Sequence, residues 1–134
     1  MLVLDNNVLS DYLNGTRGAK EFLKQYEHDE WAVSSIVLYE ACMGAVYGHI
    51  EASPRTVHQG ITASMAVLDT TAQTAAEAQT LQQELLERGA PVDQLDALIA
   101  ASAREYGGTF ATAEKQFWSE AVQSVLSVEA YRHR

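Results

Sequence analysis

Short apolar runs alternate with amphipathic segments along the whole chain. Apolar runs of three or four residues have strand length, and they predict strands at 2–4, 31–33, 65–68 and 109–112, with an edge strand at 125–128. Apolar residues at helical spacing predict helices over 8–13, 19–26, about 35–47, 54–63, 71–88, 93–105 and 114–122. This alternation favours an α/β, three-layer sandwich around a central, mostly parallel sheet of four to five strands.

Residues 1–134 are expected to form a single domain, because the chain has no internal repeat, low-complexity tract or linker. A hydrophobic fraction of 47% and a charged fraction of 20% are typical of a globular protein. One cysteine cannot form an internal disulfide, no apolar run approaches about 18 residues, and no signal peptide is evident. We therefore expect a cytoplasmic protein that does not associate with membranes.

The charge balance is acidic, with 18 acidic and nine basic residues and a net charge of −9. A protein that attracts nucleic acid over long range is normally basic. Any nucleic-acid chemistry here must therefore depend on a local site or on bound cations. The same excess of acids with few lysines is also typical of proteins from salt-adapted hosts, and that reading stays open.

Two acidic residues follow predicted strands. Asp5 comes directly after the first strand, and Glu114 comes just after the fourth. Each has a structural explanation, since Asp5 can cap the first helix and Glu114 can lie in the first turn of the last one. Sites in parallel α/β sheets lie at the carboxyl ends of strands, so both residues are also candidates for a functional site.

Two further acids lie on apolar helix faces. Glu40 shares a face with Ile36 and Val37, where a carboxylate is unfavourable unless it is paired or binds a metal. Asp96 is embedded among apolar residues near the start of its helix, while Asp93 three residues earlier is the better candidate for the helix cap. The topology of a parallel sheet can bring all four acids to one end. Such a group is tolerable chiefly around cations, and its oxygen ligands suit Mg²⁺ or Mn²⁺.

Four segments that carry these acids resemble the PIN-domain family, and specifically the VapC-like toxin ribonucleases of toxin–antitoxin pairs. Their order and spacing span nearly the whole chain. Two positions depart from the family pattern, since Asn6 stands where Thr or Ser is frequent and Glu114 where Asp is frequent. The matching segments are Leu2-Val3-Leu4-Asp5, Ser35-Ile36-Val37-Leu38-Tyr39-Glu40, Asp96-Ala97-Leu98-Ile99-Ala100-Ala101 and Thr112-Ala113-Glu114-Lys115-Gln116-Phe117.

The resemblance implies a PIN-like fold and Mg²⁺- or Mn²⁺-dependent hydrolysis of RNA that leaves a 5′-phosphate and a 3′-hydroxyl. Asp5 and Asp96 would hold the main ion, and Glu40 and Glu114 would complete the pocket and help to position the attacking water. It also implies a homodimer and inhibition by a small antitoxin protein, whose helix fills an apolar groove and whose tail reaches the acids. The polar residues expected to support the ligands are Asn6, Thr112 and Asp93.

Two other functions stay open from the sequence alone. An aspartyl-phosphate enzyme also places an Asp at a strand end, but the phosphatase pattern requires a second acid two residues later, where this chain has Asn7. A non-catalytic PIN-like scaffold that binds a partner helix would keep the fold without turnover. Binding of divalent metal distinguishes a nuclease from such a scaffold.

Overall fold

Five strands form one sheet in the computed structural model of this protein, which describes residues 1–132. The strand order is β3-β2-β1-β4-β5, and every neighbouring pair is parallel. This confirms the predicted α/β class and the parallel sheet. The strands are β1 (Leu2–Leu4), β2 (Trp31–Ser34), β3 (Ala66–Leu68), β4 (Thr109–Thr112) and β5 (Val128–Ala130).

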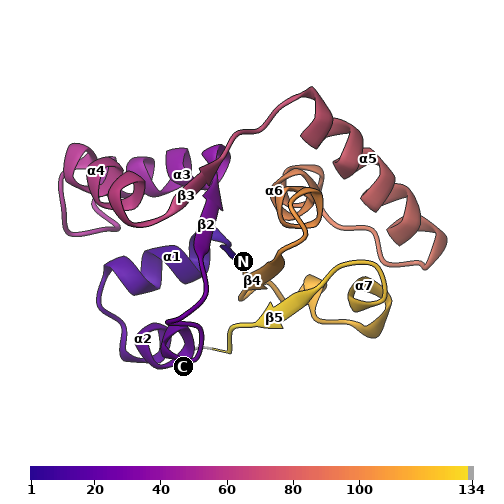
Figure 1. Cartoon of the computed structure of the whole chain (residues 1–134), viewed down its shortest axis with the longest axis horizontal. Coiled ribbons are helices and arrows are strands. Elements are labelled where there is room, and N and C mark those ends of the chain that lie inside the picture. Colours follow the sequence, from indigo (N-terminus) through magenta and orange to yellow (C-terminus); the bar gives the residue numbers. More distant parts are fainter. Residues whose placement is uncertain (133–134) are drawn as a thin grey trace.

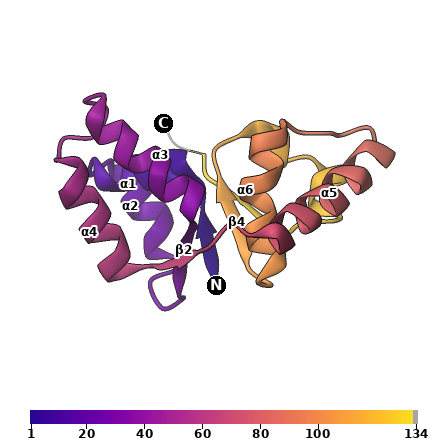
Figure 2. The ribbon, with the colours of Figure 1, turned by 90° about the horizontal axis from the view of Figure 1, so that it is seen from above.

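Helices cover both faces of the sheet, as Figures 1 and 2 show. One face carries α1 (Asn6–Leu13), α2 (Arg17–Lys24), α3 (Ser35–Val46) and α4 (Pro54–Ser64). The other carries α5 (Ala72–Glu87) and α6 (Gln94–Glu105), which pack against each other. In residues 1–132 no helix has the length and apolar character needed to cross a membrane.

The core lies between the central strands and these helices. Leu2, Val3 and Leu4 of β1 are all at most 2% exposed, because β1 has a strand on each side and a helix layer over each face. A strand buried on both faces reads as a continuous apolar run rather than an alternating one, which explains why the sequence pattern identified β1.

The C-terminal segment differs from the prediction. The helix predicted over 114–122 is instead a 3-10 turn, η1 (Lys115–Phe117), followed by the short helix α7 (Glu120–Gln123). The break occurs because Phe117 turns into the core and Ser119 starts a new helix by accepting a hydrogen bond from the Val122 amide. The edge strand, predicted at 125–128, is β5 and lies a few residues later, because Val128 pairs with Phe110 of β4.

The order of the strands creates a switch point between β1 and β4. The chain passes from β1 to β2 and β3 on one side, and then returns to place β4 on the other side of β1. Connections that leave two neighbouring strands in opposite directions open a crevice at their carboxyl ends, and ligands bind there in open α/β sheets. Asp5 and Thr112 stand at the carboxyl ends of these two strands.

Candidate active site

Asp5 is the most buried of the four predicted acids, with 6% of its surface exposed. It follows β1 and caps α1, and its Oδ1 accepts a hydrogen bond of 2.8 Å from the Asn6 amide. Its Oδ2 accepts one of 2.7 Å from the Thr112 hydroxyl. The pairing of Leu4 with Ala111 in the sheet brings these two strand ends side by side. Asp5 therefore has the capping role considered from the sequence, and it also lies at the switch point.

The pKa of Asp5 is raised from 3.8 to about 6. Burial is the main cause, because a carboxylate loses its hydration in the interior. The hydrogen bonds from Thr112 and Asn6 lower the pKa, whereas the negative charges of Asp96 and Glu114 raise it. An anion held in this way is a strong attractor for a cation.

Glu40 comes from α3, which begins where β2 ends and is capped by the Ser34 hydroxyl. Its side chain is half-buried. Burial raises the pKa of Glu40, and the negative charges of Asp5 and Asp96 raise it further. The carboxylate that is unfavourable on an apolar helix face therefore lies within electrostatic reach of the two other acids.

Asp96 lies in the first turn of α6, and Glu114 occupies the cap position just before η1, not the first turn of a long helix as predicted. Asp96 Oδ2 accepts a hydrogen bond of 2.9 Å from the side-chain amide of Gln116. The Glu114 side chain is exposed, and its backbone N–H donates to the Thr112 hydroxyl oxygen at 3.0 Å. We call Asp5, Glu40, Asp96 and Glu114 together the acidic site.

The acidic site contains no neutralising base. Within residues 1–132 no lysine, arginine or histidine forms an ion pair with any of its four members. Arg104, by contrast, binds Glu77 and Glu84 of α5 at 2.7 and 2.8 Å and so has a structural role. Repulsion among carboxylates that lack an ion-pair partner would be relieved by a bound cation, so metal binding is one chemistry that this arrangement allows.

The residues predicted to support the ligands take different positions. The Thr112 hydroxyl donates to the Asp5 carboxylate, and Asn6 contacts the same carboxylate through its backbone N–H. The side-chain oxygen of Asn6 instead accepts a hydrogen bond from the Ser10 hydroxyl at 3.2 Å. Asp93 occupies the cap position of α6 but makes no side-chain cap hydrogen bond and is exposed. No described contact joins Asp93 to the acidic site.

Two supporting residues were missed from the sequence. The Asn7 amide donates to Asp5 Oδ2 at 3.4 Å, and its oxygen accepts from the Ala113 N–H at 3.1 Å, so it links β1 to the segment after β4. Gln116 is the second, through its bond to Asp96. Asn7 stands two positions after Asp5, so its closeness in the sequence could have identified it as a partner of Asp5. The contact of Gln116 with a residue on another helix has no local signal.

The four carboxylates are oxygen donors without an ion-pair partner among residues 1–132, which is the donor chemistry that Mg²⁺ prefers. As the side chains stand, no three Asp, Glu, His or Cys residues within 1–132 converge closely enough to form a ligand cluster. Mg²⁺ usually keeps several waters and takes only one or two carboxylates directly. A divalent ion at the acidic site would therefore be held largely through its own waters.

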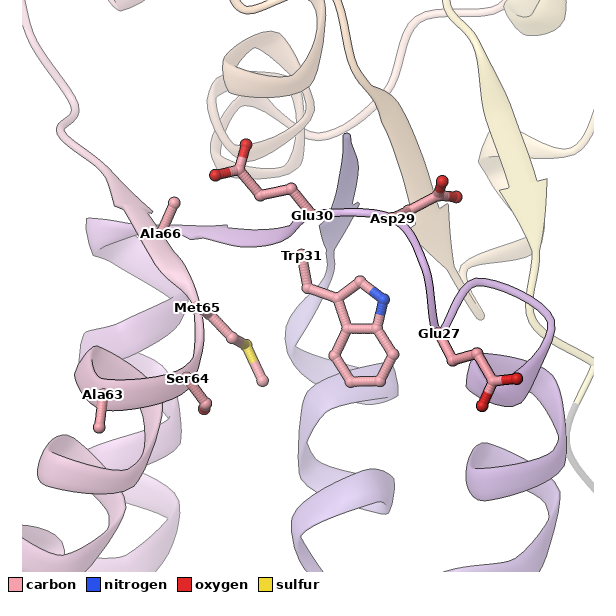
Figure 3. Close-up of a pocket in the computed structure, with 8 residues that line it drawn as sticks. All are labelled: Glu27, Asp29, Glu30, Trp31, Ala63, Ser64, Met65 and Ala66. Carbon is pink, nitrogen blue, oxygen red and sulfur yellow. The ribbon is translucent and has the colours of Figure 1, made fainter.

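A cavity of about 500 Å³ lies elsewhere, at the amino ends of β2 and β3. Trp31 and Met65 form its wall, and Glu27, Asp29 and Glu30 stand at its rim (Figure 3). None of the four members of the acidic site lines it. This cavity is therefore separate from the crevice at the carboxyl ends of β1 and β4.

Comparison with known proteins identifies the family. The model of the PIN domain matches residues 2–120. This chain belongs to the PIN domain family. The resemblance seen in the four acidic segments is thus confirmed for the family, although no curated protein matches the chain.

Solved structures share the fold over the full length. A chain of the toxin–antitoxin complex from Klebsiella pneumoniae aligns with a TM-score of 0.79 and 21% identity, and 100% of both chains is covered. A chain of VapBC2 from Rickettsia felis, bound to a DNA fragment from its promoter, aligns with a TM-score of 0.76 and 21% identity, with 98% of each chain covered. A chain of FitAB bound to the IR36 DNA fragment aligns with a TM-score of 0.79 and 22% identity, and the alignment covers 100% of this chain and 97% of that chain. At these identities the likeness establishes a common fold.

Proposed function

We propose that this PIN domain is a ribonuclease that uses Mg²⁺ or Mn²⁺ to hydrolyse RNA phosphodiester bonds, and that it is the toxin of a toxin–antitoxin pair. One observation carries the proposal. Asp5 is buried at the switch point of the sheet, it forms no ion pair with a base among residues 1–132, and its pKa is raised partly by two other acids of the same site. Carboxylates that raise one another's pKa in a crevice are a frequent mark of a functional site, and a bound cation would relieve their repulsion.

Each acid has a role in the proposed mechanism. A bound divalent ion would lower the pKa of a water and stabilise negative charge on the attacked phosphate. Asp5 and Asp96 would hold that ion, and Thr112 would fix the orientation of Asp5 through the bond at 2.7 Å. Glu40 and Glu114 would accept hydrogen bonds from water and direct it at phosphorus. In-line attack of the water oxygen on phosphorus would break the bond between phosphorus and the 3′-oxygen, which takes up a proton, and so leave a 5′-phosphate and a 3′-hydroxyl.

Fold neighbours support RNA as the substrate class. VapC20 from Mycobacterium tuberculosis is described as a toxin that cleaves the sarcin–ricin loop, and it aligns with a TM-score of 0.62 and 17% identity. The complexes from Klebsiella pneumoniae and Rickettsia felis support a cognate antitoxin as partner. The net charge of −9 is complementary to a basic segment of such a partner. We also propose a homodimer, as in the resemblance described above.

The test is cleavage of total RNA by the purified full chain with Mn²⁺, and with Mn²⁺ plus excess chelator. We expect cleavage only without chelator, and loss of cleavage in Asp5→Asn and Asp96→Asn. Asp29→Asn is the matched control, because Asp29 is an exposed acid at the distant cavity. Cleavage that persists in chelator or in both site variants would refute the mechanism. Absence of Mn²⁺ binding by calorimetry would instead favour a non-catalytic scaffold.

A further inference from the structure

Gln116 reaches the acidic site from the turn η1. Its side-chain Nε2 donates to Oδ2 of Asp96 at 2.9 Å. An ionised carboxylate can only accept hydrogen bonds, so the amide must present its NH₂ group to this oxygen. Among the described residues, Asp96 Oδ1 accepts no hydrogen bond and stays available to a ligand.

The turn that carries Gln116 is held firmly. Phe117 is fully buried, and its ring meets that of Phe110 edge-on with centroids 5.2 Å apart. On the same segment, the indole N–H of Trp118 donates to the carbonyl oxygen of Thr112 at 3.1 Å. The position of Gln116 is thus tied to β4, the strand whose end also supplies Thr112 to Asp5.

We propose that Gln116 is a positioning residue, which holds Asp96 by Oδ2 so that Oδ1 is presented to a divalent cation. The inference rests on the proposed function, since it assumes that the acidic site binds metal. Partners that orient a ligating side chain usually contribute about 10–100-fold to metal affinity or activity.

The neutrality of the amide suits this role. A lysine or arginine at position 116 would also donate to Asp96, but its positive charge would repel a divalent ion and neutralise part of the acidic site. The glutamine orients the carboxylate and leaves its full negative charge. Arg104 differs from Gln116 in both respects, because it is charged and it pairs with glutamates outside the acidic site.

The experiment measures Mn²⁺ binding to the metal-free full chain by calorimetry. Gln116→Met removes the hydrogen-bond donor and keeps a side chain of nearly the same length. Gln116→Asn keeps the amide, but its shorter side chain moves that amide away from Asp96. We expect about tenfold weaker binding in both variants. The matched control is Gln59→Met, because Gln59 is exposed on α4, a helix that carries none of the four acids. Its Mn²⁺ affinity should equal that of the wild type.

A second readout separates positioning from folding. With chelator present, the midpoint of thermal unfolding should be nearly unchanged in Gln116→Met and Gln116→Asn, whereas the upward shift produced by Mn²⁺ should shrink. Wild-type affinity in both variants would overturn the role of Gln116 and leave the proposed function intact. Unfolding of both variants in chelator would also overturn it, since the residue would then be structural. A wild-type chain that binds no Mn²⁺ would overturn the proposed function and this inference together.

Discussion

Replacement of Asp5 by asparagine is expected to stabilise the metal-free protein while it abolishes metal binding. Burial keeps Asp5 protonated up to a pKa of about 6, whereas an unfolded chain releases that proton near 3.8. Between these values the folded state binds more protons than the unfolded state, so the free energy of unfolding falls as pH rises. Above pH 6 the full penalty of the buried charge is present, and below pH 4 it is absent.

The size of this penalty follows from the raised pKa. A rise from 3.8 to about 6 corresponds to about 3 kcal/mol at pH 8, at about 1.4 kcal/mol per pKa unit. Asparagine is nearly isosteric and neutral, so it escapes the penalty. Its NH₂ group, however, cannot accept both hydrogen bonds that Oδ2 receives from Thr112 and Asn7. The lost hydrogen bonds cost about 1–2 kcal/mol, so we expect a net gain of about 1–2 kcal/mol at pH 8.

The assay is urea-induced unfolding of the wild type and Asp5→Asn at pH 8 and at pH 4, each with chelator and with Mg²⁺. We expect the variant to be more stable at pH 8 with chelator, and this advantage to vanish at pH 4, where wild-type Asp5 is protonated. Mg²⁺ should stabilise only the wild type. A variant that is less stable at pH 8, or a difference that does not change with pH, would refute the reasoning about Asp5.

Three further changes test other parts of the structure. Thr112→Val removes the donor to Asp5, so we expect a higher pKa for Asp5 by NMR titration and a loss of about 1.5–3 kcal/mol at pH 8. Arg104→Met leaves two glutamates of α5 without their partner, and urea unfolding should show a loss of about 1–3 kcal/mol; no loss would mean that the pair is solvated. Phe117→Ala empties a fully buried ring position, with an expected loss of about 3–5 kcal/mol by the same assay and weaker Mn²⁺ binding; unchanged binding would contradict the anchoring role of η1.

Local pattern was sufficient for most elements of the fold. Strands β1 to β4 and helices α1 to α6 were predicted within a few residues, because the apolar period and helix-starting residues such as Pro54 are properties of neighbouring residues. The prediction for the segment after β4 was wrong in detail. Its helical pattern over 114–122 is overridden by Phe117, which enters the core formed by distant strands, and by the Ser119 cap that restarts the helix.

For the acidic site, too, the sequence predicted some features and only the tertiary structure decided the others. The sequence shows carboxylates directly after predicted strands and on apolar helix faces. These positions made Asp5, Glu40, Asp96 and Glu114 candidates. Only the folded chain reveals how those carboxylates are held and charged. The donor to Asp5 comes from Thr112, 107 positions away, and the donor to Asp96 from Gln116. Such contacts depend on sheet register and on the packing of a turn, which no local period encodes, and the raised pKa of Asp5 exists only once the interior has excluded water.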